Sequence, residues 1–313
     1  MATQIVKPAR SRLAVSGERG HRLRLRLAIL IAAAALLMVL NLGLPYYRLP
    51  SGERFFSPAH TLFRPAGSYG LRFGQIGLGL MLMVYLYGVR KHWPWLQRQG
   101  NSRHWLDYHI LMGIVGPLLI TFHSSMKFSG FAGLAFWIMW AVVMSGFVGR
   151  YIYGQVPRTM NAAELTFKEM EQAQQELAVQ LEQQQVLSAN DLAPLFRVPA
   201  PAEVQKMSLI RSLGWMIYTD FVRCLTVSRL RRKSVSPFTM LLSLGGFLPL
   251  ASDDVEEVIS TARKQSWLTM KINFLSRSHS AFHLWHVIHR PFSYSLAVLT
   301  VIHVVTVLLL GYF

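Results

Sequence analysis

Four histidines lie in two long apolar segments and share one spacing. His109 and His123 are fourteen residues apart, and so are His289 and His303. Fourteen steps of about 100° in an α-helix return to within about 40° of the starting direction, so each pair lies on one helix face, with its imidazoles about 21 Å apart. Imidazole is a common axial ligand of haem iron. Two such helices side by side would offer two facing imidazole pairs, so we predict two bis-histidine haem b sites with these four residues as iron ligands.

Two further histidines precede His289 and compete with it as ligands. On a helix, His286 lies about 60° from His289 and about 100° from the face of His303, whereas His283 lies about 160° away. We therefore prefer His289 as the ligand and keep His286 or His283 as the alternative. Either could also contact a haem propionate or a quinone.

Small and cationic residues beside the histidines could serve the same cofactors. Gly113 and Gly116 lie between His109 and His123, where a flat porphyrin could approach the helix backbone. Close packing of helices through small residues is the alternative role for both glycines. Arg290 follows His289 and is the cation that we expect beside a propionate, although cations near helix ends also extend to the membrane surface for solvation.

Long apolar segments must hold these residues in place. The chain has 313 residues, of which 52% are hydrophobic. A helix of about 20 apolar residues crosses a bilayer core about 30 Å thick. The predicted spans are residues 27–44, 71–89, 105–125, 131–153 and 285–312. The sequence therefore predicts an all-α membrane bundle of about five spanning helices with a long helical cytoplasmic segment.

The sequence between the fourth and fifth spans has a different composition. We divide the chain into a flexible basic tail (1–26), membrane helices one to four (27–153), a helical cytoplasmic or interfacial segment (154–280) and membrane helix five (281–313). The segment 154–280 should contain three helices. The first begins at an Asn161–Glu164 capping box, and the second covers Leu209–Lys233 and suits an anionic membrane surface. The third begins at the acids Asp253 and Asp254. Residues 240–250 are apolar but too few to span.

Charge and cysteine content narrow the function. Of the 32 lysines and arginines, all but Arg48, Arg54, Arg64, Arg72 and Lys127 lie on one predicted side of the membrane. Because cations gather on the cytoplasmic side, this places the N-terminus in the cytoplasm and the C-terminus outside. The cations flank apolar segments, so we expect a lipid partner and no nucleic acid.

Cys224 is the one cysteine, which excludes an internal disulfide, c-type haem attachment and an iron–sulfur cluster held by this chain alone.

The histidine spacing resembles that of the di-haem transmembrane cytochromes b, and most closely the membrane domain of ferric reductases and NADPH oxidases, in which the third and fifth spans carry the ligands. The runs Phe282–Pro291 and Gly149–Arg158 also resemble those of uncharacterised bacterial membrane cytochromes b. The resemblance implies a multi-pass protein of the bacterial inner membrane. No Gly-rich dinucleotide fingerprint or flavin domain follows the fifth span, which departs from the oxidase pattern and puts direct use of NADPH in doubt.

We therefore expect an electron-transfer subunit of an oxidoreductase complex, ferric-reductase-like or quinone-linked. Its two haems b would carry electrons between a cytoplasmic flavin or iron–sulfur protein, or the quinone pool, and an extracytoplasmic acceptor. A quinone is a further candidate cofactor. The alternatives are a His-lined metal or proton transporter and a non-redox membrane anchor subunit of a complex.

The charge distribution makes a topological prediction. Alkaline phosphatase fused after Phe313 should be active, because five spans place this terminus outside the cytoplasm. The same enzyme fused within residues 154–280 should be inactive and serves as the matched control. Activity of the second fusion without the first would contradict the predicted orientation, and equal activity of the two fusions would contradict the fifth span.

Overall fold

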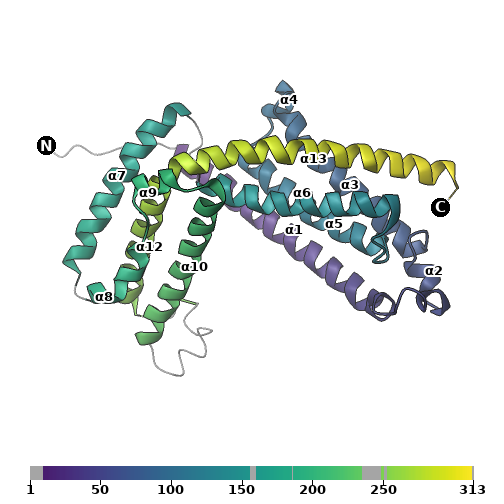
Figure 1. The fold of residues 1–313 in the computed structure, drawn as a ribbon, viewed down its shortest axis with the longest axis horizontal. Coiled ribbons are helices and arrows are strands. Elements are labelled where there is room, and N and C mark those ends of the chain that lie inside the picture. The colour runs from purple at the N-terminus through teal and green to yellow at the C-terminus, as the bar shows by residue number, and fades with distance from the viewer. Residues whose placement is uncertain (1–9, 156–159, 185, 235–247, 250–251, 312–313) are drawn as a thin grey trace. The chain divides into compact units, whose positions relative to one another are not determined.

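The computed structural model describes residues 10–155, 160–184, 186–234, 248–249 and 252–311 (Figure 1). Over these residues the chain is helical and contains no strand, which confirms the predicted all-α fold. The chain divides into two compact units, the first formed by residues 1–146 and 289–313 and the second by residues 147–288. Each unit has buried apolar cores of its own.

Five helices among the described residues are long and apolar enough to cross a membrane. They are α1 (Arg10–Tyr47), α3 (Ser68–Arg90), α5 (Ser102–His123), α6 (Gly130–Gln155) and α13 (Leu275–Leu309). Each contains one predicted span or most of it. Their apolar side chains point outward, as in α1, where Leu30, Ile31, Leu37 and Met38 are each more than 60% exposed. Lipid tails cover such surfaces in a bilayer. The architecture is that of a multi-pass membrane protein.

Helix α1 is longer than predicted. It begins at Arg10, so the prediction of a flexible tail is wrong for residues 10–26. Polar contacts with α5 explain the extension. His21 is buried, with its Nε2 3.1 Å from a carboxylate oxygen of Asp107, and its ring stacks on that of His104 at 3.6 Å. His104 in turn lies 3.2 Å from a carboxylate oxygen of Glu18. These pairs hold the start of α1 against the start of α5.

A small cap closes the far end of the first unit. It consists of η1 (Arg54–Phe56) and α2 (His60–Phe63), within the loop predicted to be a compact cap. Phe63 packs there with Tyr46, Tyr47 and Phe122 in a buried aromatic cluster.

Arg54 lies buried in this cap and bonds only backbone oxygens. Its guanidinium donates to the carbonyls of Tyr47 and Leu49 at 2.8 Å each, and to that of Ser125. Tyr47 and Ser125 stand at the C-terminal ends of α1 and α5, where helix dipoles favour a cation. Ser125 and Met126 have φ of 49° and 58°, a left-handed conformation that costs energy without glycine. Arg54 therefore fastens a strained turn directly after His123.

A second buried arginine fastens the opposite end of α5. Arg90, the last residue of α3, donates to the hydroxyl of Ser102 at 2.6 Å. Its other terminal nitrogen donates to the carbonyls of Gln97 and Gly100 at 3.0 and 2.9 Å. These acceptors span α4 (Pro94–Gln97) and the first residue of α5, so Arg90 fixes the connection between α3 and α5.

The second unit is built on three longer helices. They are α7 (Met160–Gln183), α10 (Leu209–Lys233) and α12 (Asp253–Asn273), joined by the short α8 (Ala189–Leu192), η2 (Ala193–Phe196) and α9 (Pro201–Lys206). The predicted bounds of α10 are confirmed, and α7 and α12 begin within one residue of the predicted positions. Leu195, Leu230 and Ile259 lie in the apolar core that joins η2, α10 and α12. Most of the predicted apolar stretch 240–250 lies outside the described residues.

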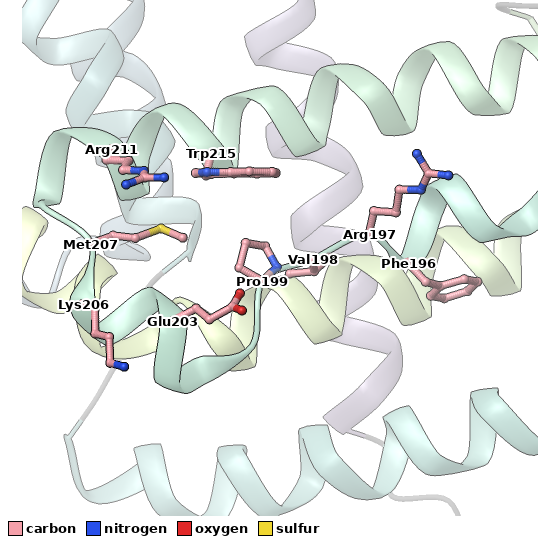
Figure 2. Close-up of a pocket in the computed structure, with 9 residues that line it drawn as sticks. All are labelled: Phe196, Arg197, Val198, Pro199, Glu203, Lys206, Met207, Arg211 and Trp215. Atoms are coloured by element: carbon pink, nitrogen blue, oxygen red, sulfur yellow. The ribbon is translucent and has the colours of Figure 1, made fainter.

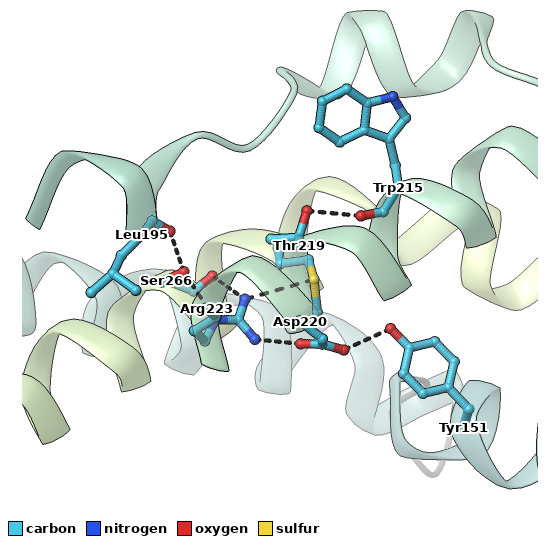
Figure 3. Close-up of polar contacts among 8 residues, drawn as sticks. Tyr151, Leu195, Trp215, Thr219, Asp220, Arg223 and Ser266 are labelled. Atoms are coloured by element: carbon cyan, nitrogen blue, oxygen red, sulfur yellow. Dashed lines mark hydrogen bonds and ion pairs between the residues drawn. The ribbon is translucent and has the colours of Figure 1, made fainter. Parts of the chain in front are cut away.

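A buried polar network also crosses the second unit (Figure 3). The hydroxyl of Tyr151 donates to Asp220 at 2.7 Å, and Asp220 accepts a second bond from Arg223. Arg223 also donates to the hydroxyl of Ser266 at 3.2 Å, and that hydroxyl donates to the carbonyl of Leu195. Burial lowers the pKa of Arg223, and the adjacent carboxylate opposes this shift. The network fixes α10 against α12 and the end of α6.

The buried cap makes a stability prediction. Arg54→Met keeps much of the side-chain volume but leaves three backbone carbonyls without their donor, which should lower the free energy of unfolding by about 3 kcal/mol. Thermal unfolding in one detergent measures the change. Arg48→Met removes an exposed arginine from the same loop and should alter stability by less than about 0.5 kcal/mol. Equal losses in the two variants would show that Arg54 has no special role.

Candidate functional site

The four predicted ligands lie on two unbroken helices of the structure. His109 and His123 belong to α5, and His289 and His303 to α13, which continues through Pro291. Each pair therefore has the helical spacing expected from the sequence.

Helix α3 positions both histidines of α5. The Nδ1 of His109 donates to the carbonyl of Val84 at 3.0 Å, and the Nδ1 of His123 donates to the carbonyl of Gly70 at 2.9 Å. Val84 and Gly70 are themselves fourteen residues apart. The imidazole donors on α5 and the carbonyl acceptors on the antiparallel helix α3 are thus spaced at the same interval of fourteen residues. Each ring is held by the backbone of the neighbouring helix.

These bonds determine which ring nitrogen can bind a metal. A carbonyl oxygen only accepts hydrogen bonds, so in His109 and His123 the proton must be on Nδ1. In the neutral ring the lone pair is then on Nε2, the nitrogen at the far end of the side chain. Histidines that bind metals usually donate their other ring N–H to a carbonyl or carboxylate in this way. In both residues Nε2 is therefore the ring nitrogen that could bind a metal.

His289 has a comparable contact with α6. Its Nδ1 lies 2.6 Å from the hydroxyl oxygen of Ser145, and that hydroxyl donates its own proton to the carbonyl of Val142 at 2.8 Å. The Ser145 oxygen therefore accepts from Nδ1–H. A side chain at Gly146 would reach the ring, because a Cβ there would lie 4.0 Å from the His289 Cε1. Helix α6 thus orients His289 as α3 orients the α5 histidines.

The contacts of α3 sort the four histidines into two levels. The Val84 carbonyl binds His109, and the hydroxyl of the next residue, Tyr85, donates to the Ser293 carbonyl at 2.6 Å. Ser293 is one turn after His289, so His109 and His289 lie at one level of the bundle. At the other level lie His123 and His303, each fourteen residues further along its helix. Pairing of His109 with His289 and of His123 with His303 stays a prediction.

An apolar layer separates the two levels. Leu296 lies seven residues from both His289 and His303 and is buried with Phe136 and Met139 of α6. Met81 of α3 and Ile120 of α5 pack against this cluster. The middle of the first unit is therefore lined by hydrocarbon, whereas imidazoles mark both of its ends.

The other predicted site residues have different surroundings. A Cβ at Gly116 would lie 3.0 Å from Met81 and 3.2 Å from the Gly77 carbonyl, so this glycine packs α5 closely on α3. Gly113 has open space where a Cβ would stand. Arg290 is exposed, and its guanidinium lies 3.4 Å from the hydroxyl of Tyr294. Gly113 and Arg290 thus have room for a ligand, and Gly116 has the packing role.

The rival histidines lie in the second unit. The Nδ1 of His286 donates to the Phe282 carbonyl of its own helix at 3.3 Å, and its ring packs on those of Phe282 and Trp285. His283 is exposed. Trp285 covers Gly149, where an added Cβ would lie 2.1 Å from the indole. The two runs used for the family resemblance therefore meet at this glycine.

The residues that orient the histidines were not predicted. Gly70, Gly74 and Ser145 lie on spans to which the sequence assigned no function. Glycines at positions 70, 74 and 77 recur every three or four residues, so they share one face of α3. This pattern is the signal that a neighbouring helix approaches closely there. Ser145 leaves no comparable signal, since single serines are common in membrane helices.

Comparisons with protein-family models, with curated proteins and with solved structures return no match for this chain. Among the described residues, no group of three or more histidine, cysteine or acidic side chains is arranged to hold a metal ion. The candidate site consists of the four histidines and the groups that orient them.

Close contact between α3 and His123 makes a second stability prediction. A Cβ at Gly74 would lie 2.7 Å from the His123 Nδ1. Gly74→Ala should therefore displace the ring, break its bond to Gly70 and destabilise the bundle by about 1–3 kcal/mol. Gly79→Ala on the same helix meets open space and should be neutral or stabilising by up to about 1 kcal/mol. Thermal unfolding of both variants tests this, and a loss of stability in Gly79→Ala as large as in Gly74→Ala would contradict it.

Proposed function

We propose that this chain is a di-haem cytochrome b subunit that carries out transmembrane electron transfer. The observation that carries the proposal is the orientation of the ligands. In His109 and His123 the Nδ1 proton is donated to the backbone of α3, so Nε2 is the nitrogen that could bind iron. His289 is oriented in a comparable way by Ser145 of α6.

The donor set fits haem b better than a free metal ion. Haem iron already has four porphyrin nitrogens and takes two axial ligands, so two imidazoles complete its coordination. His109 and His289 would hold one haem, and His123 and His303 the other. A metal ion without a porphyrin usually takes three or four protein ligands. The paired arrangement therefore favours haem.

The protein's own residues would orient the ligands and exclude water. When bound, haem b supplies one-electron redox chemistry. The carbonyls of Val84 and Gly70 and the hydroxyl of Ser145 fix the rings and raise the basicity of the ligating nitrogens. Leu296 and the apolar side chains around it keep the space between the two levels free of water. Gly113 leaves room beside α5, and Arg290 is the cation that we assign to a propionate.

The charge distribution supports a location and a set of partners. The resemblance to bacterial membrane cytochromes b favours a bacterial inner membrane. The excess of cations on one side favours an N-terminus in the cytoplasm and a C-terminus outside. The level of His109 and His289 would then face the cytoplasm. A cytoplasmic flavin or iron–sulfur protein, or the quinone pool, would exchange electrons at this level. An extracytoplasmic acceptor would do so at the level of His123 and His303.

A difference spectrum of the purified protein tests the function. Reduced-minus-oxidised spectra and pyridine haemochrome assays should give about two haems b per chain, which acidic acetone extracts because no thioether links form. A colourless preparation after expression with haem supplementation would favour the transporter or the anchor. About one haem per chain would remove the paired-site arrangement.

Ligand variants test the pairing. The same haem should be lost or become high-spin in His109→Ala and in His289→Ala, while the other haem keeps its spectrum. His123→Ala and His303→Ala should do the same at the second level. Double variants within one pair should resemble the single variants, because the effects of residues that serve one site are strongly non-additive.

His92→Ala alters an exposed histidine outside the spans and is the control. A match between His109→Ala and His303→Ala would mean crosswise pairing, and loss of a haem in His286→Ala but not in His289→Ala would reassign the ligand.

A further inference from the structure

Helix α10 has apolar side chains on two different faces, about 120° apart around the helix axis. One face carries Met216, Val227 and Leu230, each at most 5% exposed, and packs in the cores of the second unit. The other face carries Ile210, Ile217 and Phe221, which are 85%, 57% and 63% exposed. Spacings of seven and four residues put these three side chains on one stripe. Such a stripe is costly in water and marks an interaction surface.

Cations lie along one side of this exposed stripe. Arg211 and Arg229 are exposed and eighteen residues apart, so they project from the same side of α10, and Arg232 is exposed near its end. Asp220 is the one acidic residue in the sequence of α10, and it is bonded to Tyr151 and Arg223. The exposed stripe therefore lies in a positive environment. An apolar stripe with arginines along it is the pattern of helices that lie in the surface of an anionic bilayer.

A pocket at the start of α10 extends this surface (Figure 2). It has a volume of about 590 Å³. Three cations, Arg197, Lys206 and Arg211, and one acid, Glu203, line it together with an apolar wall that includes Met207 and Trp215. The Trp215 ring contacts that of Tyr218 at 5.4 Å between centroids, and Tyr218 is 57% exposed beside the stripe. Tryptophan and tyrosine are enriched at the boundary between lipid headgroups and tails. Pocket and stripe thus form one continuous surface.

We propose that α10 is an interfacial helix whose partner is an anionic phospholipid surface. Ile210, Ile217 and Phe221 insert among the acyl chains, and Arg211 and Arg229 bind lipid phosphates. The pocket, in which three cations outnumber the one acid Glu203, receives a phosphate headgroup at Arg211, with Trp215 at the level of the glycerol. Charge complementarity selects lipid over a second copy of this chain, because two copies would bring like charges together. This inference does not depend on haem binding.

Cys224 provides a native probe of this surface. It is exposed on α10, one turn after Phe221, and the sequence contains no other cysteine. A nitroxide attached to Cys224 in the full chain reports depth through its collisions with oxygen, which enters lipid, and with a water-soluble nickel chelate. The protein is placed in nanodiscs of phosphatidylcholine alone and in nanodiscs that also contain about 30% phosphatidylglycerol. Nickel accessibility should fall about fivefold in the anionic discs, and oxygen accessibility should rise.

Two variants complete the experiment. Lys264→Cys in a Cys224→Ser background puts the label on the exposed side of α12 and should keep full nickel accessibility in both discs. Arg211→Gln with Arg229→Gln should abolish the difference between the discs while the thermal unfolding of the protein is unchanged. A label at Cys224 that stays accessible to nickel in anionic discs overturns the proposal. Equal shielding in neutral and anionic discs also overturns it, since protein or neutral lipid would then cover the stripe.

Discussion

The first unit depends on hydrogen bonds between imidazole rings and the backbone of the neighbouring helix. Inside a membrane an N–H group has no water to bind, so each histidine needs an acceptor from the protein. Helix α3 supplies two, the carbonyls of Val84 and Gly70, at the same fourteen-residue interval as the histidines of α5. Ring and carbonyl meet only if the helices are close. Gly74 leaves room for the ring of His123, and Gly77 and Gly116 let the backbones approach.

The ends of α5 are fixed by other means. Arg90 ties its first residue to the preceding loop, and Arg54 ties the turn after its last residue to the cap. Both guanidinium groups are buried and bond mainly to carbonyls at the ends of helices, where the backbone has unsatisfied acceptors. A helix restrained at both ends cannot slide or rotate by a fraction of a turn. These contacts restrain the positions of its two histidines relative to α3.

The sequence predicted the elements better than the contacts between them. Hydropathy located the five spans, and helical periodicity placed each histidine pair on one helix face. Caps and charges gave the bounds of α10 and the starts of α7 and α12. The acceptors of the histidines were missed because two of them are backbone carbonyls, which every residue has. Arg54 was counted among the topology charges, since its buried environment depends on a turn seventy residues later in the chain. The extension of α1 was missed because its partners, Asp107 and His104, lie in α5.

The distance between the two imidazole levels has an electrical consequence. The levels are about 21 Å apart along α5, about two thirds of a bilayer core 30 Å thick. Leu296 and the side chains around it form a layer of low polarisability between them, so much of the voltage drop falls there. An elementary charge that passes from one level to the other would do about 1.6 kcal/mol of work per 100 mV with or against the membrane potential. Transfer between the levels would be electrogenic, and its rate and direction would respond to the energisation of the membrane.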